Sequence, residues 1–333
     1  METVRSISRI LKSRPTIEGA GVHLKRAFGY PEVPLLDPFL LLDDFHSSNP
    51  ADYIAGFPWH PHRGIETVTY MLYGSIEHGD SLGNKGLIGA GDVQWMTAGS
   101  GIIHQEMPRR SEGMFWGFQL WVNLPARYKM MKPRYREVKK DQIPVIKLNN
   151  NTITIRLISG EVAGIKGPVQ DIVVDPEYLD VSLSPHTRFE HNVPEDYTAF
   201  AYVIEGTGYF EPTLKNLIDP ETVVLFTKGK KIRITTNDDR LRFLLIAGKP
   251  IGEPVAWRGP IVMNTQQELQ IAFAEYHQGT FILNLQRIKA SSFRAASSKH
   301  LTIHGSPGAT SPPPGRISPS RCPQPLPVRQ QSS

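Results

Sequence analysis

Cysteine is nearly absent from this chain, because Cys322 is the only one among its 333 residues. A single cysteine excludes an intrachain disulfide and any metal site built from several thiolates. We therefore expect a protein of a reducing compartment, the cytoplasm, or also the nucleus in a eukaryotic cell. No apolar run approaches the roughly 18 residues that span a bilayer, and the N-terminus lacks the apolar block of a secretory signal. We expect no membrane association, with a basic organelle-targeting segment as the alternative.

Acidic residues are missing from residues 282–333, where seven Lys or Arg stand without any Asp or Glu. The preceding residues carry 30 basic and 32 acidic side chains, so the net charge of +5 comes from this tail. The body lacks the electropositive signature of nucleic-acid binding, and we expect no direct contact with nucleic acid. The tail is rich in Ser and Pro and cannot offset its chain entropy by burial, so we predict that it is disordered. The alternative is a basic arm for an acidic partner.

The body contains short apolar runs separated by clusters of Gly, Pro, Asn and Asp, which is typical of all-β sandwiches and barrels. Helical periodicity between these runs is nearly absent, which argues against a parallel α/β fold. A hairpin turn is indicated over residues 82–86, where Gly and Asn tolerate positive φ. The predicted strands include residues 67–73, 93–96, 116–122, 153–158, 199–204, 223–226 and 243–246.

One helix is indicated after Thr265, whose hydroxyl and Glu268 fit a capping box. Apolar residues follow on one face, and Gly279 is a plausible stop. A shorter helix is predicted over residues 126–131. The apolar face of the first helix consists of Leu269, Ala272, Phe273 and Tyr276.

A faint internal repeat relates residues 67–74 to residues 199–206 without gaps, at an offset of 132. Two similar β-domains, joined near residues 133–145, would satisfy both this match and the chain length. The alternative is a chance match between two unrelated strands.

Two histidine-containing pairs carry the candidate chemistry. His60 and His62 are separated by one residue, as are His104 and Glu106. In an extended strand such residues point to the same face, so each pair can reach one point in space. Three imidazoles and one carboxylate, converging inside a barrel, suit a divalent first-row metal such as iron, nickel, copper or zinc. The alternative is that a lone His-x-His pair is an exposed strand feature.

These pairs lie in longer strings, HPHRGIETVTYML, GDVQWMTAGSGIIHQEMP and QLWVNLP, which resemble the pirin family. The spacing of glycines around the histidines also resembles the two cupin motifs. The resemblance implies a bicupin of two antiparallel β-barrels with a short C-terminal helix. It predicts a metal-binding N-terminal cupin domain over residues 1–135, a C-terminal cupin domain without metal ligands over residues 136–281, and the tail over residues 282–333.

The resemblance implies one ferrous ion per chain, held in the N-terminal domain, with other divalent first-row metals as alternatives. Its ligands are then His60, His62, His104 and Glu106. Glu66 matches a cupin ligand that pirins do not use, and we expect it either to support a ligand or to be structural. In the second barrel, gapless alignment places Asn192, Pro194, Ile234 and Thr236 at the four ligand positions.

Two functions follow from the resemblance. One is a quercetinase, a dioxygenase that opens the heterocycle of flavonols such as quercetin and releases carbon monoxide, with Glu106 as general base. The other is a non-enzymatic, iron- and redox-sensing regulator that binds a transcription regulator or a metabolic enzyme. We expect a monomer in either case. Aromatic and apolar residues near the motifs either line a pocket for a flat polyphenol or fill the barrel core: Phe57, Trp59, Met96, Phe115 and Trp116.

Overall fold

The computed structural model describes residues 3–282, which consist of β-strands and one α-helix, α1 (Gln266–His277). This confirms the predicted all-β class. No helix within the described residues is long and apolar enough to cross a membrane. The predicted disorder of the tail falls almost wholly outside the described residues and stays a prediction.

The first barrel combines a seven-stranded and a four-stranded antiparallel sheet. The order in the larger sheet is β12 (Arg134–Val138), β9 (Val93–Thr97), β6 (Ile65–Tyr73), β11 (Phe115–Asn123), β4 (Phe39–Ser47), β3 (Val22–Phe28) and β2 (Arg14–Glu18). The order in the smaller sheet is β5 (Phe57–His62), β10 (Ile102–Pro108), β7 (Ile76–Asp80) and β8 (Lys85–Ile88).

The second barrel repeats this plan with the same sheet sizes. Its larger sheet runs β1 (Ile7–Lys12), β22 (Thr222–Phe226), β19 (Thr198–Gly206), β24 (Leu241–Gly248), β17 (Glu177–Leu183), β14 (Ile153–Ser159) and β13 (Val145–Leu148). Its smaller sheet runs β18 (Arg188–Asn192), β23 (Lys231–Thr235), β20 (Gly208–Tyr209) and β21 (Leu217–Ile218).

The remaining elements connect and flank the barrels. Two hairpins pair β15 (Glu161–Val162) with β16 (Ile165–Lys166), and β25 (Ala256–Arg258) with β26 (Ile261–Met263). Four short 3-10 helices are η1 (Tyr30–Glu32), η2 (Pro50–Asp52), η3 (Ala126–Tyr128) and η4 (Lys140–Gln142).

The two larger sheets pack against each other through an apolar cluster that draws residues from both barrels. Alternate residues of β6 and β19 face this cluster because successive strand side chains point to opposite sides. Phe200 is central to it, with ring centroids 5.2 Å from Phe28 and 5.3 Å from Phe39. These contacts join the barrels through a shared core.

Two buried hydrogen bonds cross this interface in reciprocal fashion. The Tyr70 hydroxyl of the first barrel donates to Asp180 of the second at 2.7 Å. The Tyr202 hydroxyl of the second barrel donates to Asp44 of the first at 2.7 Å. Tyr70 and Tyr202 are matched by the 132-residue repeat, so the repeat marks equivalent strands, β6 and β19.

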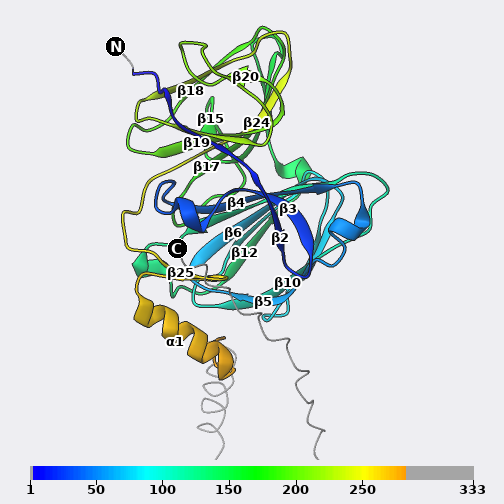
Figure 1. The fold of residues 1–333 in the computed structure, drawn as a ribbon, viewed down its shortest axis with the longest axis vertical. Coiled ribbons are helices and arrows are strands. Elements are labelled where there is room, and N and C mark those ends of the chain that lie inside the picture. The colour runs from blue at the N-terminus through cyan, green and yellow to red at the C-terminus, as the bar shows by residue number, and fades with distance from the viewer. Residues whose placement is uncertain (1–2, 283–333) are drawn as a thin grey trace, which may run out of the picture. The chain divides into compact units, whose positions relative to one another are not determined.

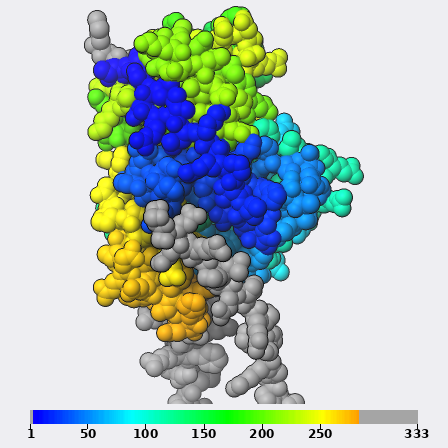
Figure 2. Space-filling view, in the orientation of Figure 1, coloured from blue at the N-terminus to red at the C-terminus, as the bar shows by residue number. Residues whose placement is uncertain are grey.

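Two terminal segments cross from one barrel to the other (Figure 1). Strand β1 pairs with β22 and completes the second barrel, although it precedes the first barrel in the chain. The yellow and orange segment that carries β25, β26 and α1 returns to the first barrel. Figure 2 shows the blue N-terminal residues lying on the surface of the green barrel. The predicted domain boundaries, at residues 135/136 and 281/282, stay a prediction. A description of the two barrels must also assign β1 to the second barrel and the segment from β25 to α1 to the first.

The local predictions agree well with the structure. Each predicted strand lies within or overlaps an observed strand, and Gly83 adopts a φ of 92° in the turn between β7 and β8. Thr265 caps α1 by accepting a hydrogen bond from the Glu268 amide, as the capping box predicts. Residues 126–131 form only the 3-10 helix η3 followed by a turn.

Candidate metal centre

Strands β5 and β10 bring three of the predicted ligands together. β5 is an edge strand, where Pro61 can stand between the two histidines because an edge position needs no further backbone donor. In the antiparallel register His60 lies opposite His104. One nitrogen from each of His60, His62 and His104 lies within 4.8 Å of the other two. The spacing of the histidines on these two paired strands therefore produces a cluster of three imidazoles inside the first barrel.

Burial keeps these imidazoles neutral. It lowers the pKa of His60, and it lowers the pKa of His62 and of His104 well below the usual histidine range. A neutral imidazole has one nitrogen that donates and one whose lone pair is free to bind a metal. The cluster therefore presents lone pairs rather than positive charges.

Backbone carbonyls select which nitrogen is free in two of the rings. A carbonyl can only accept, so the Nδ1–H of His60 donates to Pro58 at 2.8 Å and that of His62 donates to Pro260 at 3.0 Å. Both Nε2 atoms then carry lone pairs, and they lie 3.1 Å apart. Two lone pairs at this distance repel each other unless a cation or a proton lies between them.

The donor set fits a metal ion. Two nitrogens on adjacent coordination positions, each about 2.1 Å from an ion, lie about 3 Å apart, close to the observed separation. The third ring, His104, is buried, and neither of its nitrogens has a hydrogen-bond partner. Buried polar atoms without partners are rare and costly, and a metal would satisfy one of these nitrogens. The arrangement can hold a metal ion.

Glu106 lies on β10 with His104 and is buried. Its Oε1 accepts from the Thr69 hydroxyl at 2.9 Å, and its Oε2 accepts from the Gln119 amide at 2.9 Å. Each carboxylate oxygen can accept more than one bond, so capacity remains for a metal or a proton. The carboxylate is held in place by its neighbours. It lies near enough to His60 for its charge to oppose in part the lowering of the His60 pKa, of which burial is the largest cause.

Glu66 does not join the histidine cluster. Its carboxylate accepts from the Thr97 hydroxyl at 2.6 Å and from Trp95 Nε1 at 3.1 Å. It lies at an odd number of residues from Thr69 on β6, so its side chain points to the opposite face of the strand. Of the two roles expected for Glu66, these contacts favour the structural one.

The aromatic residues chosen from the sequence are mostly not at the cluster. Phe57, Met96 and Phe115 belong to apolar clusters, and Trp116 donates to Asp44 near the interface. Trp59 is 51% exposed beside His60.

Two tryptophans missed by the sequence analysis approach the ligands instead. The Trp121 ring centroid lies 5.1 Å from that of His62, and Trp257 lies 5.7 Å from Trp121. Trp121 Nε1 also donates to Gln119, whose amide bonds Glu106. These contacts arise because β11 pairs with β6 and because β25 returns to the first barrel. The sequence carried no signal for either.

Comparisons with known proteins agree with this geometry. The pirin family model matches residues 21–122, and the model of the pirin C-terminal cupin domain matches residues 178–282. A pirin-like protein from Caulobacter vibrioides is 46% identical over 279 residues, which cover 84% of this chain and 99% of that protein. This chain belongs to the pirin family.

Other pirin relatives extend the comparison. Human pirin is 41% identical over 279 residues, covering 83% of this chain and 93% of its own. The crystal structure titled quercetin 2,3-dioxygenase from Acinetobacter baumannii superposes with a TM-score of 0.78 and 33% identity, covering 84% of this chain and all of that one. The two-barrel fold of this pirin is therefore shared along the full length of solved relatives.

In the second barrel of this pirin, two of the four positions that correspond to the proposed ligands hold residues other than those that the gapless alignment predicted. In β23, Ile234 and Ile232 lie opposite Phe189 and His191 of β18, as His104 and Ile102 lie opposite His60 and His62. The counterparts of the first two histidines are therefore Phe189 and His191, and the gapless prediction of Asn192 and Pro194 is wrong. Seven residues lie between His191 and Ala199, whereas four lie between His62 and Thr67, so the loop is longer.

No chelating set forms in the described part of the second barrel. Phe189 and Ile234 are buried apolar residues, and His191 bonds Glu177 at 2.8 Å. Across residues 3–282 the one cluster suited to a metal consists of His60, His62 and His104.

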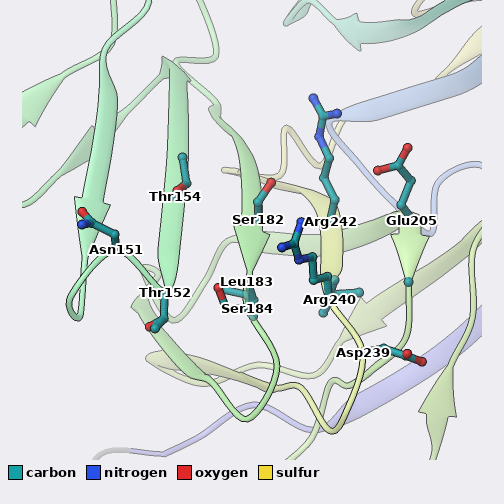
Figure 3. Close-up of a pocket in the computed structure, with 12 residues that line it drawn as sticks. Asn151, Thr152, Thr154, Ser182, Leu183, Ser184, Glu205, Asp239, Arg240 and Arg242 are labelled. Carbon is teal, nitrogen blue, oxygen red and sulfur yellow. The ribbon is translucent and has the colours of Figure 1, made fainter.

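A separate groove of about 690 Å³ lies on the second barrel, away from the histidine cluster. Figure 3 shows its polar side chains on neighbouring strands, with Arg242 and Glu205 on one side and Thr154 on the other. Arg242 is already paired with Asp180, which the interface uses. The groove contains none of the predicted ligands.

Proposed function

We propose that this pirin is an iron(II)-dependent dioxygenase that opens the heterocycle of flavonols such as quercetin, with release of carbon monoxide. The observation that carries the proposal is the cluster of three imidazoles, two buried and one half-buried, with the Glu106 carboxylate beside it. A relative that is 33% identical along its whole length bears the name quercetin 2,3-dioxygenase.

His60, His62, His104 and Glu106 would hold one ion per chain. When bound, a ferrous ion supplies a Lewis acid for the substrate oxygens and the redox chemistry that dioxygen requires. The carbonyls of Pro58 and Pro260 keep the Nδ1 protons in place, so the Nε2 atoms stay available.

Glu106 is the candidate general base. In the first step a carboxylate oxygen takes the proton of the flavonol 3-hydroxyl, which leaves the substrate oxygen negatively charged and electron-rich. Thr69 and Gln119 donate to the two carboxylate oxygens and fix their direction before the substrate arrives. A base that is already oriented needs little rearrangement in the transition state.

Trp121 and Trp257 are suited to orient a flat aromatic substrate near His62. Tyr30 continues the row, with its ring centroid 5.6 Å from that of Trp257, and is 66% exposed. Offset and edge-to-face contacts with aromatic rings bind a flat polyphenol and exclude water from one side of it.

The test is oxygen uptake with quercetin by iron-loaded protein and by the Glu106→Gln variant. Gln keeps the shape and can still accept one hydrogen bond, but it cannot take the proton. We expect the variant to retain iron and to lose about 100-fold or more in turnover. Metal content is measured in the same samples, and Glu77→Gln, an exposed acid on β7, serves as the control. Full turnover per bound iron in Glu106→Gln would remove this residue from the reaction.

One observation favours the regulator as a second function. Trp59 adjoins a proposed ligand and is half exposed, and an exposed tryptophan is a frequent anchor of protein interfaces. A wild-type protein that is fully loaded with ferrous iron but consumes no oxygen with several flavonols would favour this role.

A further inference from the structure

The segment of residues 255–282 returns from the second barrel to the metal-binding one; we call it the strap. It contains β25, β26 and α1. Val262 of the strap is fully buried in an apolar cluster with residues of the first barrel, among them Ile65 and Trp121. A second cluster joins the strap helix to Ile103 of β10, the residue before His104. The strap is therefore packed against β10, which carries His104 and Glu106, and against residues of β6 and β11.

The turn of the strap hairpin reaches a proposed ligand directly. The Pro260 carbonyl accepts the Nδ1 proton of His62 across 198 residues of chain. His60 obtains the same kind of support from Pro58, only two residues away. A carbonyl that fixes the tautomer and the ring orientation of a metal-binding histidine strengthens metal binding. One of the three imidazoles thus depends on a distant segment for its orientation.

Arg63, which follows His62, attaches the strap at a second point. Its buried guanidinium donates to the Ser100 carbonyl, to Glu275 at 2.6 Å and to the Phe281 carbonyl at 3.0 Å. It also lies 4.2 Å from the Phe281 ring centroid. A buried cation needs a partner, and Glu275 of the strap supplies the carboxylate.

Lys129 attaches the strap at a third point. Its buried Nζ donates to the carbonyls of Gly64 and Val262 and to the Asn123 side chain, at 2.7 to 3.1 Å. Gly64 has a φ of 78°, and a Cβ there would overlap the Val262 carbonyl oxygen. This close approach and the three hydrogen bonds fix the strap against the residues that directly follow His62.

We infer that the strap is a positioning element of the metal centre, and that strap docking and metal binding are coupled. The strap holds His62 in the tautomer and orientation that bind the ion, so loosening it weakens binding. By linkage, a bound ion must in turn tighten the strap. The inference rests on the metal site of the proposed function but not on its substrate or its chemistry.

Cobalt(II) is a suitable probe because its visible spectrum reports the arrangement of its ligands. The full-length wild type, Glu275→Gln and Lys129→Met are loaded with cobalt, and its release to excess chelator is timed. Neither substituted residue touches a proposed ligand. The control is Glu190→Gln, which removes the partner of Arg233 in the second barrel at similar exposure, 35% against 27% for Glu275.

We expect both strap variants to release cobalt about 10-fold faster or more, in line with the loss of an outer partner of a metal site, and to show an altered cobalt spectrum. The control should match the wild type. If Lys129→Met does not fold, the isosteric Glu275→Gln decides alone. Release within twofold of the wild type, with an unchanged spectrum, would overturn the inference.

Hydrogen exchange tests the reverse direction on the wild type. Amides of residues 256–263 should exchange more slowly after cobalt loading, whereas those of β18 should not change. Equal exchange of the strap with and without cobalt would contradict the coupling. Both measurements are independent of turnover. A protein that binds cobalt and couples it to the strap, but does not consume oxygen with flavonols, would refute the proposed dioxygenase and leave this inference standing.

Discussion

The two barrels share a strand order but differ in what their strands direct inward. In the first barrel Thr69 of β6 lies between Gln94 of β9 and Gln119 of β11. In the second barrel Ala201 of β19 takes the place of Thr69, and its neighbours are apolar. At the positions of Thr69, Gln94, Gln119 and His104 the second barrel has, in the same order, Ala201, Val224, Leu245 and Ile234. The second barrel shows that this fold forms with an apolar interior. The polar side chains inside the first barrel therefore require an explanation other than folding.

The barrels also differ in the hydrogen bonding of their interior side chains. Thr236, the counterpart of Glu106, donates to the Ser184 carbonyl and accepts from the Thr187 amide. In the first barrel both nitrogens of His104 and the Gln94 amide nitrogen have no partner. Unpaired buried groups cost about 1–3 kcal/mol each. The two unpaired nitrogens of His104 support the proposal that the first barrel binds a metal ion.

The largest effect is expected where the barrels share one core. Phe200→Ala should lower the free energy of unfolding by about 3–5 kcal/mol, since it removes a fully buried ring between Phe28 and Phe39. Its counterpart on β6 is Val68, a smaller side chain. Val68→Ala should cost less, and denaturant unfolding compares the two. Equal costs would show that the barrels do not differ at this shared contact.

His104→Ile turns one interior position into its counterpart in the second barrel. We expect metal affinity to fall by more than the roughly 10- to 100-fold that loss of an outer partner costs. The metal-free protein should keep or gain stability, because two unpaired buried nitrogens are replaced by apolar surface. Metal titration and thermal melting check both parts. A variant that melts far below the wild type would mean that the imidazole supports the fold.

The reciprocal tyrosines test how similar the barrels are. Tyr70→Phe and Tyr202→Phe each remove one hydrogen bond to a buried carboxylate, at Asp180 and Asp44 respectively. Tyr202→Phe also removes the longer bond, 3.3 Å, that this hydroxyl accepts from Ser13. Each should cost about 1.5–3 kcal/mol of unfolding free energy, and the two costs should be similar. A large cost for one and none for the other would show that the interface is not reciprocal in energy.

The last effect concerns the pH dependence of Lys129, which donates a hydrogen bond to Val262 of the strap. Burial lowers the pKa of Lys129 to about 7. Between this value and about 10.4, where a lysine titrates in the unfolded chain, the unfolded state binds more protons. Stability therefore rises with pH across this range, by at most about 1.4 kcal/mol per pH unit from this group. Lys129→Met should remove this contribution, so urea unfolding between pH 7.5 and 9.5 should show a flatter profile than the wild type. Parallel profiles would contradict the lowered pKa.

Local signals in the sequence predicted much of the fold. The capping box before α1 depends on residues only three apart, and the alternation of β5 and β10 depends on residues two apart. Such patterns are fixed by short-range geometry and can be read without the fold. The shared face of His60 and His62 was predicted for this reason.

Long-range pairing could not be predicted in the same way. No sequence pattern near β1 predicts its pairing with β22, and none near Pro260 predicts its hydrogen bond with His62. The gapless alignment failed at β18 because a longer loop shifts the register by three residues without changing the strand pattern. The contacts of Thr69 and Gln119 with Glu106 likewise depend on which strands become neighbours.

The claim that only the first barrel binds metal is tested most directly by counting ions in a matched pair of variants. His62 and His191 occupy equivalent positions in β5 and β18. After anaerobic loading with ferrous iron and removal of excess metal, the wild type and His191→Ala should each contain about one equivalent per chain, and His62→Ala should contain far less. Two equivalents in the wild type, or a full equivalent retained by His62→Ala and lost by His191→Ala, would contradict the claim.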